Sequence, residues 1–185
     1  MTQLYLVRHG QTQWSMTGQY TSVSDIELTD EGRVQAERLR TRLNPADFGL
    51  VLSSPRRRAC ATAELAGFTP EIDPNLAEWF YGDFEGMTPA QINQVIPDWQ
   101  IWHQDPPGGE TATEVVARFN RVVTRVRDSG VDKAICFSHG HALRVLALCW
   151  IGLDVKYGGS FPLDTASVSV LGADQSIAAI LRWNT

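Results

Sequence analysis

Three short apolar runs in this chain each lead into arginine or histidine, and this pattern constrains the fold more than any other feature. The first run, residues 4–7, is followed directly by Arg8 and His9. The other two lead into the basic segments 53–58 and 138–141. Ligands of open α/β sheets bind beyond the carboxyl ends of the strands, so three such strands would gather positive charge at one place. The pattern predicts an anion site, and phosphate is its natural occupant.

The rest of the hydrophobic pattern alternates between strands and helices. It predicts an α/β fold, a three-layer α/β/α sandwich with a mostly parallel central sheet. The last two strands are predicted to form a hairpin that turns at residues 173–175. The predicted strands are 4–7, 49–52, 133–137, 168–171 and 177–181; the predicted helices are 30–43, one from 55, one near 89–96, one from 111 and 142–150, with 10–28 as a long loop.

Two of the predicted helices carry recognisable start signals. Thr111 and Glu114 have the spacing of a capping box. Ser54 followed by Pro55 is typical of an N-cap with proline at the first helical position. The faces that these helices would bury are Val115, Phe119, Val122 and Val126 in the first and Ala59, Ala63 and Ala66 in the second.

Residues 67–111 differ in composition from the rest of the chain. They hold six of the nine prolines and no lysine or arginine. This composition predicts a partly irregular insertion over the sheet edge, covering the active site, with one short helix. The length of the chain favours a single domain over residues 1–185.

The net charge limits the classes of partner. The chain carries a formal net charge of −5, which argues against nucleic acid, because that partner requires a basic face. No stretch approaches the roughly 20 apolar residues of a membrane span, and the run 4–7 is too short for a signal peptide. We therefore expect a cytoplasmic protein with no membrane partner; the sequence gives no indication of its oligomeric state.

The cysteines predict no special chemistry. There are three of them, Cys60, Cys136 and Cys149, and no CxxC pair. An odd number without paired spacing indicates neither a disulfide framework nor a structural zinc site. We expect all three to be small core residues.

Residues 6–12, Leu-Val-Arg-His-Gly-Gln-Thr, resemble the signature of the histidine phosphatase superfamily, which includes the cofactor-dependent phosphoglycerate mutases. Matching segments follow in the expected order at residues 28–32, 53–63, 76–86, 108–110 and 138–141, so the resemblance covers nearly the whole chain. Within the family the chain looks most like the acid phosphatase-like and sugar bisphosphatase-like members. The resemblance implies an α/β sandwich that acts on a small phosphorylated substrate.

The resemblance also implies a role for particular residues. His9 would be the phosphorylated nucleophile and Glu78 the proton donor. Many members carry asparagine where this chain has Ser15, so the chain departs from the family pattern there. The catalytic set implied by the resemblance is Arg8, His9, Arg58, Glu78 and His139, and the further substrate-binding set is Ser15, Gln19, Tyr20, Thr21, Gly140 and His141.

Phosphoryl transfer to histidine explains why these residue types are needed. The attacking imidazole must be neutral, with one ring nitrogen facing phosphorus. We expect the other nitrogen of His9 to donate to a backbone carbonyl, which fixes the tautomer. Arg8 and Arg58 suit the phosphoryl oxygens because a guanidinium presents a planar fork of donors, and His139 is expected to help as an imidazolium. No metal or other cofactor is required, because the protein supplies the cations.

Three alternatives stand beside a metal-independent phosphomonoesterase. The first is phosphoglycerate mutase-type phosphoryl transfer, but residues 59–117 offer no lysine or arginine to hold the distal anion of such a substrate. The second is hydrolysis at a metal held by His139 and His141, although the chain has only four histidines. The third is a phosphate-sensing module without turnover, which the presence of both His9 and Glu78 disfavours.

The leaving group of the substrate is left open by the sequence. Sugar phosphates, sugar bisphosphates, phosphoglycerate derivatives, nucleotides and phosphoproteins all remain candidates. Arg144, Lys156 and residues 19–20 lie outside the 67–111 segment and are candidates for a second anion site.

Overall fold

A six-stranded sheet forms the centre of the structure, a computed structural model that describes residues 2–185. The strand order is β3-β2-β4-β1-β5-β6. Strands β1 to β4 run parallel, β5 is antiparallel to β1, and β6 is antiparallel to β5. The strands are β1 (Gln3–Arg8), β2 (Leu50–Ser53), β3 (Glu71–Ile72), β4 (Lys133–Ser138), β5 (Val168–Asp174) and β6 (Ile177–Arg182). The predicted α/β class with a mostly parallel sheet is confirmed.

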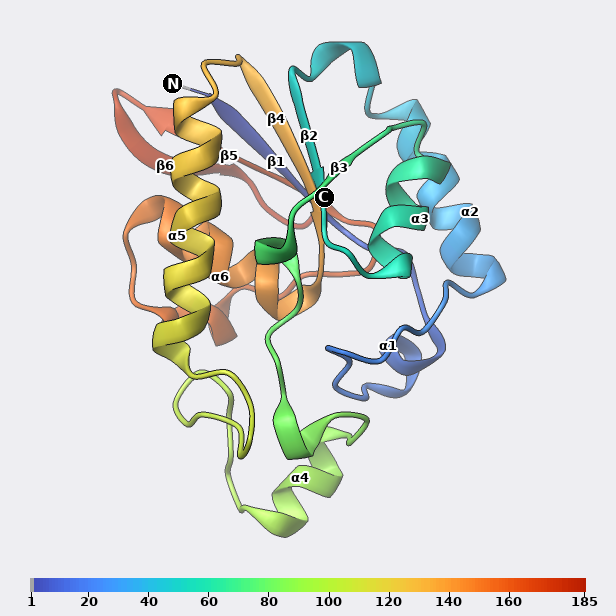
Figure 1. The fold of residues 1–185 in the computed structure, drawn as a ribbon, viewed down its shortest axis with the longest axis vertical. Coiled ribbons are helices and arrows are strands. Elements are labelled where there is room, and N and C mark those ends of the chain that lie inside the picture. Colours follow the sequence, from blue (N-terminus) through green and yellow to red (C-terminus); the bar gives the residue numbers. More distant parts are fainter. Residues whose placement is uncertain (1) are drawn as a thin grey trace.

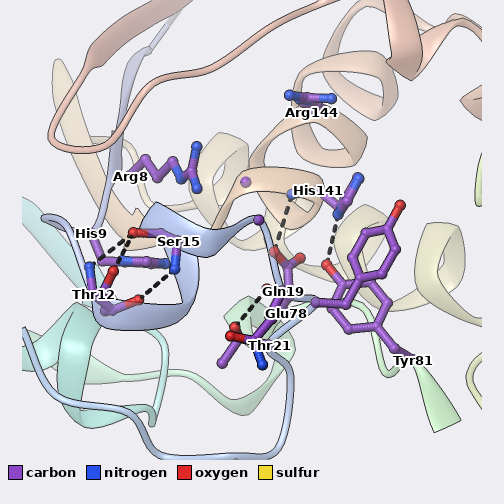
Figure 2. Close-up of a pocket in the computed structure, with 13 residues that line it drawn as sticks. Arg8, His9, Thr12, Ser15, Gln19, Thr21, Glu78, Tyr81, His141 and Arg144 are labelled. Carbon is purple, nitrogen blue, oxygen red and sulfur yellow. Dashed lines mark hydrogen bonds between the residues drawn. The ribbon is translucent and has the colours of Figure 1, made fainter. Parts of the chain in front are cut away.

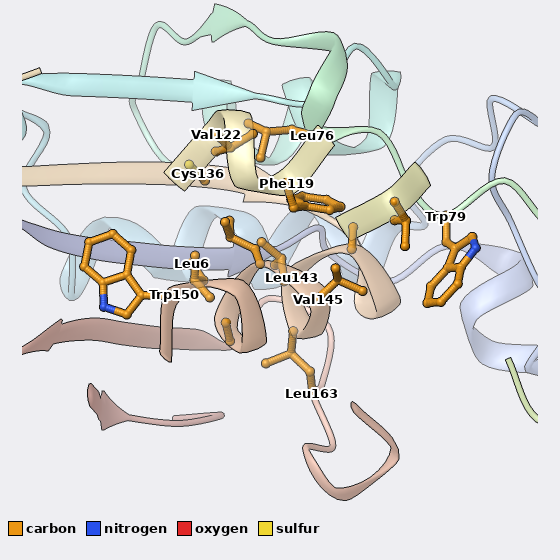
Figure 3. Packing of buried hydrophobic residues seen from close by; sticks show 14 of the residues in the cluster. Leu6, Leu76, Trp79, Phe119, Val122, Cys136, Leu143, Val145, Trp150 and Leu163 are labelled. Carbon is orange, nitrogen blue, oxygen red and sulfur yellow. The ribbon is translucent and has the colours of Figure 1, made fainter. Parts of the chain in front are cut away.

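Helices cover both faces of this sheet (Figure 1). Because side chains alternate along a strand, Leu6 packs with α5 (Ala112–Asp128) and α6 (Gly140–Ile151), whereas Val7 packs with α3 (Arg57–Leu65). Figure 3 shows the first of these clusters. The remaining helices are α1 (Gln13–Thr17), α2 (Asp30–Arg38), α4 (Pro89–Val95) and five 3-10 helices at Leu39–Thr41, Pro45–Asp47, Pro74–Leu76, Gly82–Phe84 and Val155–Ser160.

The strand register brings the three basic segments to one edge. Arg8 at the end of β1 pairs with Ser138 at the end of β4, and Ser53 at the end of β2 pairs with Phe137. The residues that follow each strand therefore leave the sheet side by side. The convergence predicted from the sequence is present.

The start of α3 differs from the prediction. The helix begins at Arg57, with Arg56 in an extended conformation as its N-cap residue, and not at Pro55. Ser54 is fully buried, and its hydroxyl lies 2.7 Å from Nε2 of His139. A tertiary contact therefore occupies the side chain that the local pattern assigned to capping, while the small face of Ala59, Ala63 and Ala66 is buried as predicted.

The start of α5 agrees with the prediction. Thr111 and Glu114 form the expected capping box at the N-terminus of α5. The four apolar residues assigned to its inner face, Val115, Phe119, Val122 and Val126, are all fully buried. Hydrophobic periodicity was sufficient to predict the buried face of α5 because the helix packs along its whole length.

Two other local predictions require correction. Residues 10–28, predicted as a loop, contain α1, which Thr12 and Ser15 open with a reciprocal capping box and which Gly18 closes at a φ of 74°. The β5–β6 hairpin is present, but its positive-φ turn residues are Gln175 and Ser176, later than the predicted turn. Both differences arise from local polar chemistry that hydrophobic periodicity does not report.

Residues 67–111 include β3 within the sheet and then continue beyond the carboxyl ends of the strands, where α4 occupies the lower end of the view in Figure 1. The predicted short helix is α4. The segment does more than cover the sheet edge, because Trp79, Trp99 and Trp102 are buried in the same cluster as α5 and α6. The assignment of residues 1–185 to a single domain with an insertion stays a prediction.

Of the predicted core cysteines, Cys136 is buried, and Cys60 and Cys149 are half-buried. Across residues 2–185, no helix has the length and apolarity needed to cross a membrane.

Candidate active site

A cavity of about 140 Å³ opens beyond the carboxyl ends of β1 and β4 (Figure 2). Nine of the eleven predicted site residues line it, and Arg58 and His139 do not. The lining consists of Arg8, His9, Thr12, Ser15, Gly18, Gln19, Tyr20, Thr21, Glu78, Tyr81, Gly140, His141 and Arg144.

His9 is held in one tautomer at the inner end of the cavity. Its backbone N–H donates to the carbonyl of Ser138 at 2.9 Å, which fixes the residue beside β4. Burial, followed by the charges of Arg58 and Arg8, holds the pKa of His9 well below its usual range. The ring is therefore neutral, and its Nδ1–H donates to the Gly10 carbonyl at 2.7 Å, as expected from the sequence. Nε2 is left with a lone pair, which is the form that a nucleophile requires.

Arg8 places a partly unpaired guanidinium in the cavity. Its Nη1 donates to the Leu163 carbonyl at 2.5 Å, while its buried Nε has no partner among the described residues. Arg8 thus has hydrogen-bond donors available for a bound anion.

Behind the cavity, Ser54, Arg58 and His139 form a closed group that we call the inner layer. Nε of Arg58 donates to Nδ1 of His139 at 3.1 Å, and Nε2 of His139 lies 2.7 Å from the Ser54 hydroxyl. Since guanidinium only donates, Nδ1 must accept and the ring of His139 is neutral. Burial, followed by the charge of Arg58, also holds the pKa of His139 well below its usual range. The predicted imidazolium form of His139 is therefore wrong for this arrangement.

The remaining donors of Arg58 hold the loop at one side of the cavity. They reach the carbonyls of Ser24 at 2.9 Å and Thr21 at 3.0 Å. The side chain is 1% exposed, so its charge acts on the cavity from behind. Edge-to-face packing of the His139 ring on the ring of His9, with 5.2 Å between centroids, connects the inner layer to the cavity.

Glu78 lies at the N-terminus of α6, across the cavity from Arg8. Its carboxylate accepts from the backbone N–H groups of Ala142 at 2.7 Å, Trp79 at 2.9 Å and His141 at 3.1 Å. The positive end of a helix dipole favours an acidic group at this position. Three main-chain contacts therefore fix the carboxyl group at the cavity wall.

The chain around Glu78 is held in turn by Arg118. Its guanidinium donates to the carbonyls of Ala77 at 2.8 Å and Glu78 at 3.1 Å. The carboxylate of Glu110 fixes Arg118 through a 2.6 Å ion pair. Glu110 acts on the site through Arg118.

A tyrosine and a histidine form the next part of the cavity wall. The hydroxyl of Tyr81 lies 2.6 Å from Nδ1 of His141. Burial, followed by the charge of Glu78, holds the pKa of Tyr81 well above its usual range, and burial, followed by Arg144, holds that of His141 well below. The protonated Tyr81 and the neutral ring of His141 therefore share one hydrogen bond at Nδ1.

Short polar contacts shape the side of the cavity formed by residues 15–21. Gln19 donates to the Gly86 carbonyl at 2.8 Å, and Thr21 to the Gln19 carbonyl at 3.0 Å. The Ser15 hydroxyl donates to the Thr12 carbonyl and accepts the Thr12 N–H, both at 2.9 Å. The structure places these residues at the cavity, and their contact with substrate stays a prediction.

Three lining residues, Thr12, Gly18 and Tyr81, are outside the predicted site set. Thr12 belongs to the same segment as Arg8 and His9, Gly18 precedes Gln19, and Tyr81 follows Glu78 by three positions, so proximity to predicted residues was the available signal. Of the candidates for a second anion site, Arg144, Gln19 and Tyr20 line the cavity, whereas Lys156 is exposed and lies 3.5 Å from Asp154.

The two-histidine metal arrangement has no counterpart in the structure. His139 faces Arg58 and Ser54, while His141 faces Tyr81. Within residues 2–185, no group of three or more His, Cys, Asp or Glu side chains is placed to hold a metal ion.

Comparison with known proteins identifies the family of this chain. An acid phosphatase from Mycobacterium tuberculosis is 38% identical over 94% of this chain and 88% of its own length. A sedoheptulose 1,7-bisphosphatase from Saccharomyces cerevisiae is 33% identical over 82% of this chain and 68% of its own. A solved structure of an open-reading-frame product from Mycobacterium tuberculosis superimposes with a TM-score of 0.95 at 35% identity, covering 99% of this chain and 97% of that one. The family model described as "Histidine phosphatase superfamily (branch 1)" matches residues 4–185. The chain therefore belongs to the histidine phosphatase superfamily.

Proposed function

We propose that this phosphatase is a metal-independent phosphomonoesterase that hydrolyses small phosphorylated metabolites through a phosphohistidine at His9. The observation that carries the proposal is the state of His9. Its ring is neutral, donates from Nδ1 to Gly10, and lines a cavity that also contains Arg8 and Glu78.

In the first step, Nε2 of His9 attacks phosphorus and the bond from phosphorus to the leaving oxygen breaks. Arg8 neutralises charge on the phosphoryl oxygens, and the Nδ1–H contact to Gly10 stabilises the positive charge that develops on the ring. Glu78, in its protonated form, gives its proton to the leaving oxygen, so the product departs as an alcohol.

In the second step, water attacks the phosphohistidine. The Glu78 carboxylate takes a proton from this water, the bond between phosphorus and Nε2 breaks, and His9 returns to its neutral form. Inorganic phosphate leaves, and Glu78 is protonated again for the next cycle.

Arg58 and His139 support this chemistry from the inner layer. Arg58 is the nearby charge with the largest effect on His9, so its positive field opposes protonation of the nucleophile and stabilises a bound phosphoryl group. His139 packs against the His9 ring and limits its rotation. We assign both residues a positioning and electrostatic role.

The test is a phosphatase assay with chelator present, combined with trapping of labelled protein by a quench in alkaline detergent. We expect phosphate release that survives chelation, inhibition by vanadate, and an acid-labile, alkali-stable label on His9 that the His9→Asn variant does not acquire. Loss of all activity on chelation, or label on another residue, would overturn the proposal. Binding of phosphoesters without any release of phosphate would instead support a sensing module.

Mutase-type transfer is separated from hydrolysis by the fate of the phosphoryl group. The part of the cavity formed by residues 67–111 contributes Glu78 and Tyr81 and no basic side chain. We therefore expect 3-phosphoglycerate to give inorganic phosphate faster than 2-phosphoglycerate. The opposite ratio would favour the mutase. The cytoplasmic location stays a prediction.

A further inference from the structure

Arg144 is a half-buried arginine that forms no ion pair with any carboxylate of residues 2–185. It lies in the second turn of α6 and lines the cavity that contains His9. Its Nε is shielded from solvent and has no hydrogen-bond partner within the same range. Its nearest directional contact is the face of Trp102, 5.7 Å from the guanidinium carbon. A buried donor without an acceptor costs free energy, so this position needs an explanation.

Three other buried or half-buried arginines, Arg58, Arg118 and Arg125, have acceptors. Arg118 is held by Glu110 and by three backbone carbonyls. Arg58 donates to His139 and to the loop at residues 21–24. Arg125 pairs with two carboxylates. Arg144 differs from all three because its guanidinium faces the cavity with its donors unused.

Arg144 also lines two spaces that share part of their walls. Besides the His9 cavity, it lines a hollow of about 400 Å³ together with Tyr20, Trp99 and Trp102. Tyr20 lines both spaces as well. The His9 cavity is the smaller of the two spaces, so it accommodates a phosphoryl group while the rest of a metabolite extends past these two side chains.

We propose that Arg144 binds a second anionic group on the leaving part of the substrate, so that the preferred substrates are phosphomonoesters carrying another phosphate or a carboxylate. This inference rests on the function proposed above. The leaving oxygen lies next to Glu78, and the rest of the leaving group passes between Tyr20 and Arg144 toward the hollow. A guanidinium with free, fork-shaped donors suits either anion.

The charge balance of the cavity supports an anionic substrate with more than one charged group. The lining has two guanidinium groups, Arg8 and Arg144, against one carboxylate, Glu78, while His9 and His141 are neutral. Figure 2 shows Arg8 and Arg144 on the same side of the cavity. Arg8 lies beside the nucleophile and accounts for the transferred phosphoryl group. The charge of Arg144 is therefore available to bind a second anionic group.

The test compares matched substrates that differ only in the second anionic group. One pair is 3-phosphoglycerate and glycerol 3-phosphate, and the other is fructose 1,6-bisphosphate and fructose 1-phosphate. The readout is the ratio of kcat/KM within each pair, measured for the wild type and for Arg144→Met, which keeps the packing on Trp102 and removes the charge. The two pairs distinguish a carboxylate from a phosphate as the second group.

The matched control is Arg56→Met. Arg56 is also half-buried with a shielded, unpartnered Nε, and it lines the other hollow that borders Glu78. Both variants therefore lose one arginine of the same kind on opposite sides of the proton donor. Circular dichroism and urea unfolding verify that each variant is folded, and Arg144→Lys tests whether a point charge without the planar fork restores the preference.

In the wild type we expect the substrate with two anionic groups to be preferred in at least one pair. Arg144→Met should reduce that preference by about 10- to 100-fold through KM, the range expected for a lost charge-assisted hydrogen bond, and Arg56→Met should leave it unchanged. An unchanged preference in Arg144→Met, or a larger loss in Arg56→Met, would overturn the inference while leaving the phosphatase proposal intact. Wild-type protein that releases phosphate from neither pair would overturn both.

Discussion

The inner layer and the cavity wall use the same residue types in opposite ways. In the inner layer, Arg58 and His139 are bonded to each other and to neighbouring groups, with both ring nitrogens occupied. In the wall, Arg8 and Arg144 each keep a buried donor unpaired, and His9 leaves Nε2 free. The difference teaches that satisfied polar groups fix geometry, whereas unsatisfied ones at a cavity are available for a ligand. The predictions below test this division, beginning with the largest expected effect.

The sharpest test replaces one histidine of the cavity wall, His9, and one histidine of the inner layer, His139. His9→Asn should lower kcat by at least about 10⁴-fold, because no nucleophile remains, and should abolish the trapped phosphoenzyme. His139→Asn should still acquire the label on His9, because the inner layer does not react. The exposed His103 provides the control, since His103→Asn should retain wild-type turnover. A phosphoenzyme in His9→Asn would contradict the assignment of the reactive histidine to the cavity wall.

Glu78→Gln tests the proton donor at the wall. We expect kcat to fall by about 10²- to 10⁴-fold on alkyl phosphates, the usual range for a lost general acid. The loss should be smaller with p-nitrophenyl phosphate, whose leaving group needs no proton. Glu64→Gln, on the exposed side of α3, is the control. Equal losses on both substrates would contradict the assignment of proton transfer to Glu78.

Arg58→Gln tests whether the inner layer serves stability. The substitution removes donors to His139 and to the carbonyls of residues 21–24, so the free energy of unfolding should fall by about 2–4 kcal/mol. Arg57→Gln is the matched control at the next position. Its side chain is exposed and forms only surface ion pairs with Asp25 and Glu27, so its effect should stay within about 0.5 kcal/mol. Urea unfolding measures the free energy of unfolding of both variants, and equal losses would contradict the stabilising role of the inner layer.

The lowered histidine pKa values predict how the protein responds to acid. The pKa values of His9, His139 and His141 lie below the value near 6.5 of an unfolded chain. The unfolded state therefore binds more protons below pH 6.5, and stability is complete above this pH and decreases as the pH falls. The slope should be at most about 1.4 kcal/mol per pH unit for each histidine. Urea unfolding at several pH values measures it.

Catalysis should depend on pH in the same direction as stability, with a decrease toward acid pH. His9 must be neutral to attack phosphorus, and because its pKa is lowered, kcat/KM should persist below pH 6.5 before an acidic limb appears. A limb centred at pH 6.5 or above would show that burial and the two arginines do not control the nucleophile. Proton titration of the His9 ring by NMR provides an independent measurement.

Ser15→Ala should have the smallest effect. The hydroxyl caps α1, so we expect a loss of about 1 kcal/mol in stability and a change in kcat/KM of only a few fold. Gln91→Ala removes the side chain at the same N3 position in the capping box of α4, on residues that do not line the His9 cavity, and should have a similar effect on stability alone. A much larger loss of activity in Ser15→Ala would indicate direct contact with the phosphoryl group.

The convergence of the three strand ends was predictable because it depends on backbone topology. Parallel strands place Arg8, Ser54 and His139 at one edge whatever the side chains do next. Helix α5 was equally predictable, because its capping box and apolar face act locally. The family segments added Glu78, which no periodicity indicates.

The charge states in the site could not be predicted in the same way. The neutral ring of His139 depends on Nε of Arg58, which is 81 positions away in the chain. The displaced start of α3 has the same origin, since the Ser54 hydroxyl contacts His139 and reaches only the N–H of Arg56, the residue that precedes the helix. Tyr81 and Arg144 reach the cavity only through tertiary packing. Such pairings are three-dimensional facts that a local pattern does not contain.

The way in which Glu78 is held has a consequence for how substrate preference changes within such an enzyme. Its carboxylate rests on peptide N–H groups, including those of His141 and Ala142, and replacing a side chain leaves a peptide N–H in place unless proline is introduced. Exchanges at His141 or Arg144 can therefore alter what the leaving group meets without removing the support of the acid. Single replacements along α6 can therefore change substrate preference, while Glu78 and its contacts to peptide N–H groups stay in place.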